Sequence, residues 1–177
     1  MAQQQLPPRL RDLRPLRIPQ AVLGETQEMD GEIVRRWNET VADDDTVYVL
    51  GDLGRRKNAL KVRDLKGIKR LVGGNGDDLA ALMGWGLFES VGVVKYLPGL
   101  VLSHIPVHPS QLGRGTLNVH GHLHARSLDD LRYLCVSVDQ TEFRPIPLDR
   151  LMGMATGRAL AANRRLSPTN PWADEPA

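Results

Sequence analysis

Cysteine is nearly absent from this chain of 177 residues, in which Cys135 is the single example. One cysteine excludes an internal disulfide framework. Long apolar runs are also missing, because none approaches the roughly 20 residues that a membrane-spanning helix needs. The opening residues contain no apolar stretch of the signal-peptide type. We therefore predict a cytoplasmic protein without a membrane span.

A strong charge of one sign is missing as well. The 23 Lys and Arg residues nearly balance the 21 Asp and Glu residues, which leaves a formal net charge of +2. Such a balance gives little bulk attraction to nucleic acid. Hydrophobic residues make up 41% of the chain and charged residues 25%, which argues against a disordered polyelectrolyte or a fibrous repeat. Length and composition together predict one folded domain.

Proline and arginine are concentrated at the start of the chain, which divides it into three segments. Residues 1–25 are predicted to form a basic, proline-rich arm, because repeated prolines disfavour regular elements. Residues 26–166 carry the periodic apolar patterns of a folded domain. Residues 167–177 are read as a tail, and no internal repeat is found.

The first half of the domain predicts a strand–helix–strand unit. Apolar spacing favours an amphipathic helix over residues 26–41. Residues 46–50 form a continuous, β-branched apolar run, typical of a strand buried on both faces. A short helix over 58–65 and a second strand over 68–72 follow, and this order favours parallel pairing of the two strands.

The second half predicts a hairpin followed by further strands. A helix is expected over residues 79–87. Residues 91–97 and 100–103 are expected to pair across Pro98-Gly99, because Pro then Gly suits the inner positions of a type II turn. Further elements are predicted in order: a strand over 116–119, a strand over 133–138 and a helix over 148–166, where Gly153 and Gly157 weaken the helical signal.

Four successive apolar strands each end in a residue that can bind a metal ion. These residues are Asp52, Asn75, His104 and the pair His122 and His124. In sheets with parallel strands, the loops at the carboxyl ends form the binding crevice, so residues far apart in sequence can meet there. Taken singly, each is a common turn or structural residue. Their joint occurrence predicts a metal site.

The histidines sharpen this prediction, because all five lie between positions 104 and 124. His120, His122 and His124 are spaced by two, although Gly121 is expected to bend the segment, so only the last two are taken as a pair. Imidazole nitrogen with carboxylate and amide oxygen suits manganese, iron or zinc. Mixed nitrogen and oxygen ligands indicate hydrolytic chemistry rather than a thiolate structural site.

The segments VLGDLG, GGNGDD, LSHIP and NVHGHLH resemble the calcineurin-like metallophosphoesterases. The ordered blocks of that family run D-x-H, G-D, G-N-H-D/E, H and G-H-x-H. The similarity spans about residues 26–151, and the flanking stretches look like the small single-domain enzymes of bacteria and their phages. The resemblance implies an α/β fold, specifically a four-layer α-β-β-α sandwich with mixed sheets and two cations at its upper edge.

The resemblance also implies roles for individual residues. Asp52 would bridge both cations, while Asn75, His104 and His122 would complete the second site and His124 would face the first. Asp52, Asn75 and His104 are thus expected to be catalytic as well as metal-binding. Two such ions lower the pKa of a bridging water and hold the phosphoryl oxygens during in-line attack.

Two further histidines lie close in sequence to these ligands. We include His120 among the catalytic candidates, because it could assist a bound phosphate. His108 could do the same, or could be a simple loop residue between Val107 and Pro109.

The chain departs from the family pattern in two blocks. The only candidate for D-x-H is Asp12 to Arg14, and arginine cannot ligate a cation. Gly76 stands where the family has a histidine that helps to stabilise the phosphate, and loss of a general acid costs about 10²- to 10⁴-fold in rate. The first site could be rebuilt by Asp12, Asp77 or Asp78.

Two functions follow from these matches and departures. The preferred hypothesis is a metal-dependent phosphoesterase of weak or altered activity, acting on a phosphodiester or phosphomonoester. The alternative is a non-catalytic module of the same fold that binds nucleic acid, a nucleotide or a protein partner. Its candidate contacts are arginines, namely Arg9, Arg11, Arg14, Arg17, Arg35, Arg36, Arg55 and Arg56.

Overall fold

The computed structural model describes residues 27–54, 59–113 and 115–165. The predicted arm over 1–25 and the predicted tail over 167–177 lie outside these residues. Helices and two separate sheets make up the described chain, so the predicted α/β class is confirmed. Among the described helices, none is long and apolar enough to cross a membrane.

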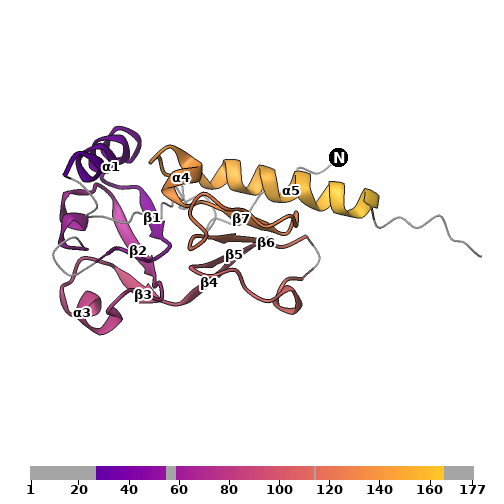
Figure 1. Ribbon diagram of the computed structural model, residues 1–177, viewed down its shortest axis with the longest axis horizontal. Coiled ribbons are helices and arrows are strands. Elements are labelled where there is room, and N and C mark those ends of the chain that lie inside the picture. Colours follow the sequence, from indigo (N-terminus) through magenta and orange to yellow (C-terminus); the bar gives the residue numbers. More distant parts are fainter. Residues whose placement is uncertain (1–26, 55–58, 114, 166–177) are drawn as a thin grey trace, which may run out of the picture.

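The first sheet has the strand order β1-β2-β3, and both of its pairings are parallel. Helices α1 and α3 lie on its side away from the second sheet (Figure 1). The predicted parallel unit is confirmed, although its connection is a short 3-10 helix, η2. The elements are α1 (Gln27–Thr40), β1 (Thr46–Val49), η2 (Leu60–Asp64), β2 (Ile68–Val72), α3 (Leu79–Gly84) and β3 (Ser90–Gly92).

The second sheet has the order β4-β5-β6-β7, in which only the β4–β5 pair is antiparallel. Helix α5 runs along this sheet (Figure 1). The elements are β4 (Val94–Leu97), β5 (Leu100–Ser103), η3 (Pro109–Gln111), β6 (Leu117–His120), β7 (Tyr133–Cys135), α4 (Val138–Thr141) and α5 (Leu148–Arg165).

The predicted hairpin is partly confirmed. Val94 pairs with Ser103 and Leu97 with Leu100 across the turn, where Gly99 has a φ of +73° as a type II turn requires. The single strand predicted over 91–97 is wrong, because the chain leaves the first sheet after Gly92 and enters the second at Val94.

Strand β1 shows why its continuous apolar run is needed. Val47 and Val49 face a core that contains Ile33 and Trp37 of α1. Tyr48 and Leu50 point the other way, into a second core formed with strands of the second sheet and with α5. Because strand side chains alternate, a strand buried on both faces must be apolar throughout. The burial predicted for residues 46–50 is confirmed for 47–50.

Helix α1 is fixed to the first sheet by one buried face. Asp30, Ile33 and Trp37 are its buried residues, and their spacing of three and four places them on one side of the helix. The indole Nε1 of Trp37 donates to the Lys66 carbonyl at 2.9 Å. Asp30 forms an ion pair with Lys61 of η2. These contacts join the helix to the connection between β1 and β2.

Candidate metal centre

The structure brings together residues from the carboxyl ends of four strands. Asp52 and Asn75 follow the parallel strands β1 and β2 of the first sheet, and His104 and His122 follow the parallel strands β5 and β6 of the second. Ligand atoms of Asp52, His104 and His122 all lie within 4.8 Å of one another. These three residues could hold a metal ion.

His104 stands at the centre of this group and is only 2% exposed. Its Nε2 atom lies 3.1 Å from Oδ2 of Asp52 and 3.0 Å from Oδ1 of Asn75. Nδ1 of His122 lies 3.2 Å from Nε2 of His104. Four side chains, two from each sheet, therefore point their ligand atoms at one place.

A backbone contact determines which ring nitrogen of His104 faces the candidate metal site. Its Nδ1 atom lies 2.7 Å from the carbonyl oxygen of Leu50, the residue after β1. A carbonyl oxygen only accepts, so Nδ1 carries a proton, and Nε2 is the ring nitrogen that can present a lone pair to a cation. The carboxylate oxygen of Asp52 and the amide oxygen of Asn75 also present lone pairs. A cation fits this set of donors, and a backbone partner on the far nitrogen is usual for metal-binding histidines.

Two of the three grouped residues have an unusual backbone conformation. Asp52 has a φ of +53° and His122 a φ of +66°, which is the left-handed region that non-glycine residues rarely adopt. Such conformations are held only where the surroundings require them, and they cluster at functional sites. Asp52 directly follows Gly51 and His122 directly follows Gly121, in each case just after a buried strand.

The loops after β1 and β2 touch backbone to backbone. A Cβ atom added to Gly51 would overlap the backbone of Gly73 and Gly74, and one added to Gly74 would overlap the amide and carboxylate of Asp52. Glycine at both positions is what allows this approach. The amide of Gly76 donates to Oδ1 of Asp52 at 3.0 Å, which leaves Oδ2 directed at His104.

Asp77 and Asp78, considered above as substitute ligands, have other partners. Oδ2 of Asp77 accepts from the amides of Asp52 and Gly74 at 2.9 and 2.8 Å, and Oδ1 accepts from the amide of Leu53 at 2.9 Å. Asp78 is the N-cap of α3 and accepts from Ala81 at 3.1 Å. The third substitute, Asp12, lies outside the described residues.

The loop of residues 121–126, which carries His122, is supported from the strand and helix that follow. The thiol of Cys135 lies 3.8 Å from the Gly121 carbonyl and 3.7 Å from that of His124. Gln140 donates to the His124 carbonyl at 3.1 Å. These supports were not anticipated from the sequence, because a lone buried cysteine and an isolated glutamine carry no local pattern.

His124 and His120 are not part of the three-residue group. His124 is exposed, and its Nδ1 lies 3.7 Å from a carboxylate oxygen of Asp139. His120 is fully buried, and its Nδ1 donates to the Gly121 carbonyl at 2.8 Å. Burial lowers the pKa of His120, which favours the neutral ring. A side chain that solvent cannot reach does not touch a substrate, which argues against the catalytic role expected for His120.

His108 is the N-cap residue of η3. Its Nδ1 lies 2.8 Å from the hydroxyl of Ser110 and accepts from the Ser110 amide at 3.2 Å, which caps η3. Nearby, the buried side chain of Asn118 accepts from the Val107 amide at 2.9 Å and donates to Val101 and Ser103. Asn118 therefore fixes the segment that follows His104.

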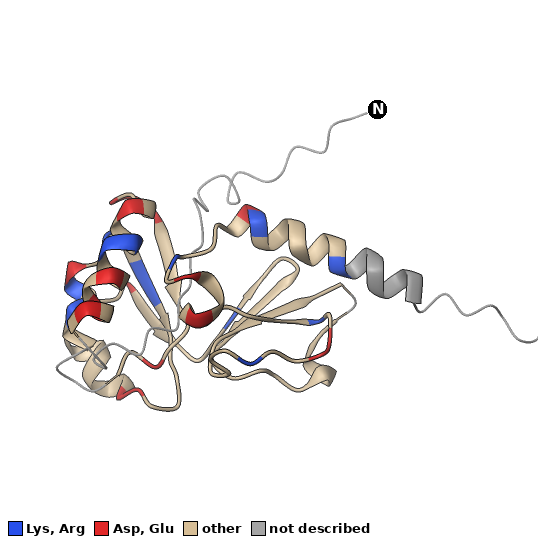
Figure 2. Ribbon diagram, turned by 45° about the horizontal axis from the view of Figure 1, so that its top comes forward, with Lys and Arg blue, Asp and Glu red and all other residues tan. Residues whose placement is uncertain are grey.

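The described arginines of the alternative hypothesis are already paired. Arg35 and Arg36 both bind Glu32 within α1, and their hydrogen bonds lower the pKa of Glu32 to about 2. Charges of both signs mix on this helix (Figure 2). The other arginines named for nucleic-acid binding, at 9, 11, 14, 17, 55 and 56, lie outside the described residues.

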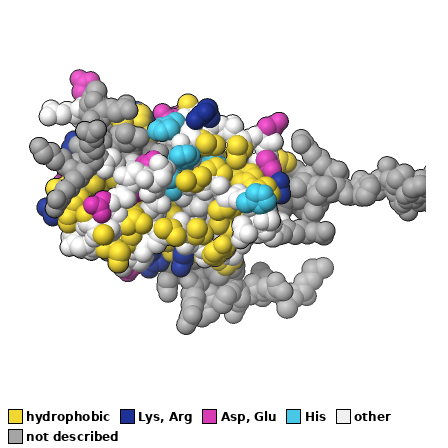
Figure 3. All heavy atoms as spheres, turned by 60° about the horizontal axis from the view of Figure 1, so that its bottom comes forward, with side chains coloured by type: hydrophobic (Ala, Val, Ile, Leu, Met, Phe, Trp, Pro, Cys, Tyr) yellow, Lys and Arg dark blue, Asp and Glu magenta, His cyan; other side chains and the backbone are white. Residues whose placement is uncertain are grey.

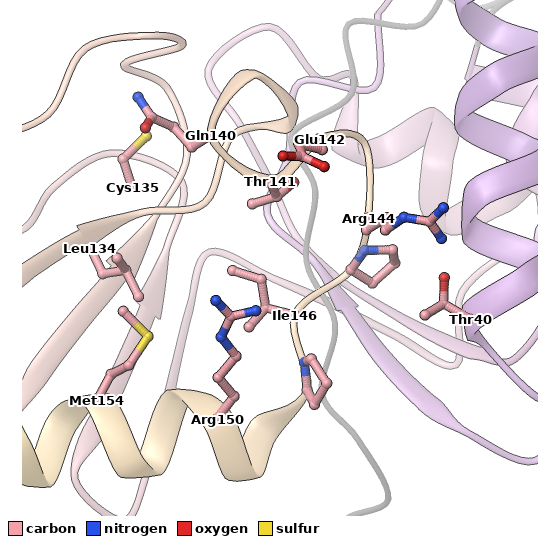
Figure 4. A pocket seen from close by; sticks show the side chains of 12 residues that line it. Thr40, Leu134, Cys135, Gln140, Thr141, Glu142, Arg144, Ile146, Arg150 and Met154 are labelled. Atoms are coloured by element: carbon pink, nitrogen blue, oxygen red, sulfur yellow. The ribbon is translucent and has the colours of Figure 1, made fainter.

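Hydrophobic side chains lie on the same face of the molecule as the histidines (Figure 3). Figure 3 shows histidine side chains on a face where hydrophobic side chains predominate. Ile105, the residue after His104, is 48% exposed. A separate cavity of about 500 Å³ lies between the end of α1, β7 and α5 (Figure 4), and none of the grouped residues lines it.

Fold and site together define an α/β protein with a candidate metal centre at the edges of two sheets. No family model matches the chain. It is 31% identical over 139 residues to the uncharacterized protein MJ1445 of Methanocaldococcus jannaschii, an alignment that covers 71% of this chain and 74% of that protein. The chain belongs to the family of that protein.

Two further similarities were found. Gene 66 protein of Mycobacterium phage L5 is 28% identical over 138 residues, which covers 57% of this chain and 67% of that protein. The crystal structure of the protein of unknown function AQ665 from Aquifex aeolicus superposes with a TM-score of 0.60 at 20% identity. That alignment covers 79% of this chain and 97% of the other, and it shows a shared fold alone.

Proposed function

We propose that this protein is a metal-dependent phosphoesterase of the calcineurin-like type. The observation that carries the proposal is the set of candidate ligand atoms around Nε2 of His104, contributed by Asp52, Asn75 and His122 from three other strand ends. The order of these residues along the chain is that of the G-D, G-N, H and G-H-x-H blocks. Manganese, iron or zinc would suit this mixture of nitrogen and oxygen ligands.

The four-layer α-β-β-α arrangement is part of the same proposal. Its support is the division of the core, because β1 sends alternate side chains toward α1 and toward the second sheet. Strands β5 and β6 are buried at every position, as inner strands covered on both faces would be. The outer layers would then be α1 and α3 on one side and α5 on the other.

In the proposed reaction, each residue has a separate task. Asp52 would supply negative charge, Asn75 an amide oxygen, and His104 and His122 imidazole nitrogens. The Leu50 carbonyl holds the His104 ring in the form that can bind a cation. A divalent ion at this place would polarise a phosphoryl oxygen and lower the pKa of a bound water. We place one ion here, because His124 is directed at Asp139.

The substrates should be phosphate esters with good leaving groups. Gly76 has no side chain with which to protonate a departing oxygen, and general-acid catalysis commonly contributes about 10²- to 10⁴-fold. An aryl phosphodiester needs little of this assistance, because its phenolate leaves without a proton. We therefore expect measurable hydrolysis of bis-p-nitrophenyl phosphate and much slower hydrolysis of alkyl esters.

The test compares His122→Ala with the matched control His108→Ala. Purified protein is stripped with chelator, reloaded with Mn²⁺ and assayed on bis-p-nitrophenyl phosphate. We expect His122→Ala to lower kcat/KM by at least about 100-fold, the upper end of what loss of an outer-shell partner costs. His108→Ala removes an exposed imidazole bonded to Ser110 and should retain wild-type activity.

Two results would contradict the proposal. The first is a wild-type rate no higher than that of the metal-free blank. The second is an equal loss in both variants, which would separate activity from the candidate site. Mn²⁺ binding without hydrolysis would favour the alternative, a non-catalytic module of this fold, whose specific support is the missing side chain at Gly76.

A further inference from the structure

One carboxylate joins the two ligand loops of the first sheet. Asp77 accepts from the amides of Asp52 and Leu53, which follow β1, and from the amide of Gly74, which follows β2. The three contacts are between 2.8 and 2.9 Å, and both oxygens of the carboxylate take part. The backbone of one loop is therefore bound to that of the other through this side chain.

This connection acts at a residue with a left-handed backbone conformation. Asp52 is held at a φ of +53°. Asp77 accepts hydrogen bonds from the amide of Asp52 and from the amide of Leu53. The loops also meet at Gly74, whose position tolerates no Cβ because the amide and carboxylate of Asp52 occupy that space. A conformation of this kind persists only when neighbouring contacts require it. Asp77 supplies those contacts.

We infer that Asp77 is a positioning residue, which sets the distance between Asp52 and Asn75 so that both reach one cation. The inference rests on the proposed function, because it needs that cation. It differs from a ligand role, since both oxygens of Asp77 are occupied by backbone amides. By holding Gly74, the carboxylate also places the amide of Gly76 on Oδ1 of Asp52, and Oδ2 is left for the site.

Asparagine at position 77 tests this with almost no change in volume. Its amide group has one oxygen, so its NH₂ must face at least one of the three N–H donors. We expect Asp77→Asn to weaken Mn²⁺ binding by about 10- to 100-fold, the range typical of lost outer-shell partners. The measurement is calorimetric titration of chelator-stripped full-length protein with Mn²⁺.

Asp78 provides controls at the adjacent position. Asp78→Asn keeps an N-cap for α3 and should change neither stability nor Mn²⁺ affinity. Asp78→Ala removes the cap and should lower the unfolding midpoint while leaving the affinity for Mn²⁺ unchanged. If Asp77→Asn does not fold, Asp77→Glu replaces it, because glutamate keeps both oxygens but displaces them by one methylene. A loss of Mn²⁺ affinity is expected there too.

The outcomes separate this inference from the proposed function. Mn²⁺ affinity that is unchanged in the position-77 variant, or reduced equally by Asp78→Ala, overturns the role of Asp77 and leaves the phosphoesterase proposal standing. Affinity that falls as expected in a protein without hydrolytic activity overturns the proposed activity alone. A wild-type protein that binds no Mn²⁺ overturns both.

Discussion

At the scale of single residues, the candidate centre depends on two glycines as much as on its ligand side chains. The loops after β1 and β2 approach so closely that a methyl group at Gly74 would overlap Asp52, and one at Gly51 would overlap Gly74. Gly74 does not have a positive φ, so its requirement is for space rather than for backbone freedom. This distinction makes a clean steric test.

Gly74→Ala should therefore damage both the fold and the metal site. The added Cβ must displace Asp52 or its own loop, and overpacking of this kind costs about 1–3 kcal/mol of the free energy of unfolding. We also expect weaker Mn²⁺ binding, because Asp52 moves relative to His104. Urea denaturation and calorimetric titration measure the two effects.

Gly84→Ala is the matched control. Gly84 ends α3, and nothing lies within 4 Å of its added Cβ. The same substitution should there leave Mn²⁺ affinity as in the wild type. Wild-type Mn²⁺ affinity in Gly74→Ala would mean that the loop contact is unimportant for the site.

The sequence could predict only those site residues that directly follow an apolar strand. Asp52, Asn75, His104 and His122 follow apolar strands, and parallel pairing brings them together as expected. His124 does not join them. Its direction depends on the left-handed conformations of His122 and His124 themselves, which the spacing of the residues does not reveal. The burial of His120 depends likewise on packing between sequence-distant strands.

At the scale of elements, the sequence pattern likewise does not reveal which sequence-distant strands pair with one another. Residues 91–97 form one stretch rich in strand-forming residues, and nothing in its pattern indicates that its first part pairs with β2 and its second with β5. The change of sheet is decided by where each partner strand lies. Helix α5, by contrast, follows its apolar spacing from Leu148 despite two internal glycines.

Replacing those two glycines of α5 should stabilise the protein. Gly153 and Gly157 are exposed, neither has a positive φ, and nothing lies within 4 Å of an added Cβ at either position. Alanine should raise the free energy of unfolding by about 0.5–1 kcal/mol at each, because glycine loses more backbone entropy in a helix. Urea denaturation of Gly153→Ala, Gly157→Ala and the double variant checks the gains and their additivity. A loss of stability in either single variant would contradict this expectation.

At the scale of the whole molecule, a bound ion would connect the two sheets. Asp52 and Asn75 follow strands of the first sheet, whereas His104 and His122 follow strands of the second. The sheets also meet through apolar side chains such as Tyr48 and Leu50 and through the contact of His104 Nδ1 with the Leu50 carbonyl. Apolar contacts tolerate small relative shifts of the layers, while metal–ligand distances do not. Ion binding should therefore stabilise the native arrangement as a unit.

Manganese should accordingly raise the melting temperature of the whole protein. Free Mn²⁺ at 100 times its Kd adds about 2.7 kcal/mol to the free energy of unfolding, which for a chain of this size corresponds to about 5–11 °C. Chelator should reverse the shift in thermal melts followed by circular dichroism. His122→Ala should abolish it, because one ligand from the second sheet is lost, whereas His108→Ala should retain it. An equal shift in both variants would place the stabilising ion elsewhere, and the two sheets would then not be joined at His104.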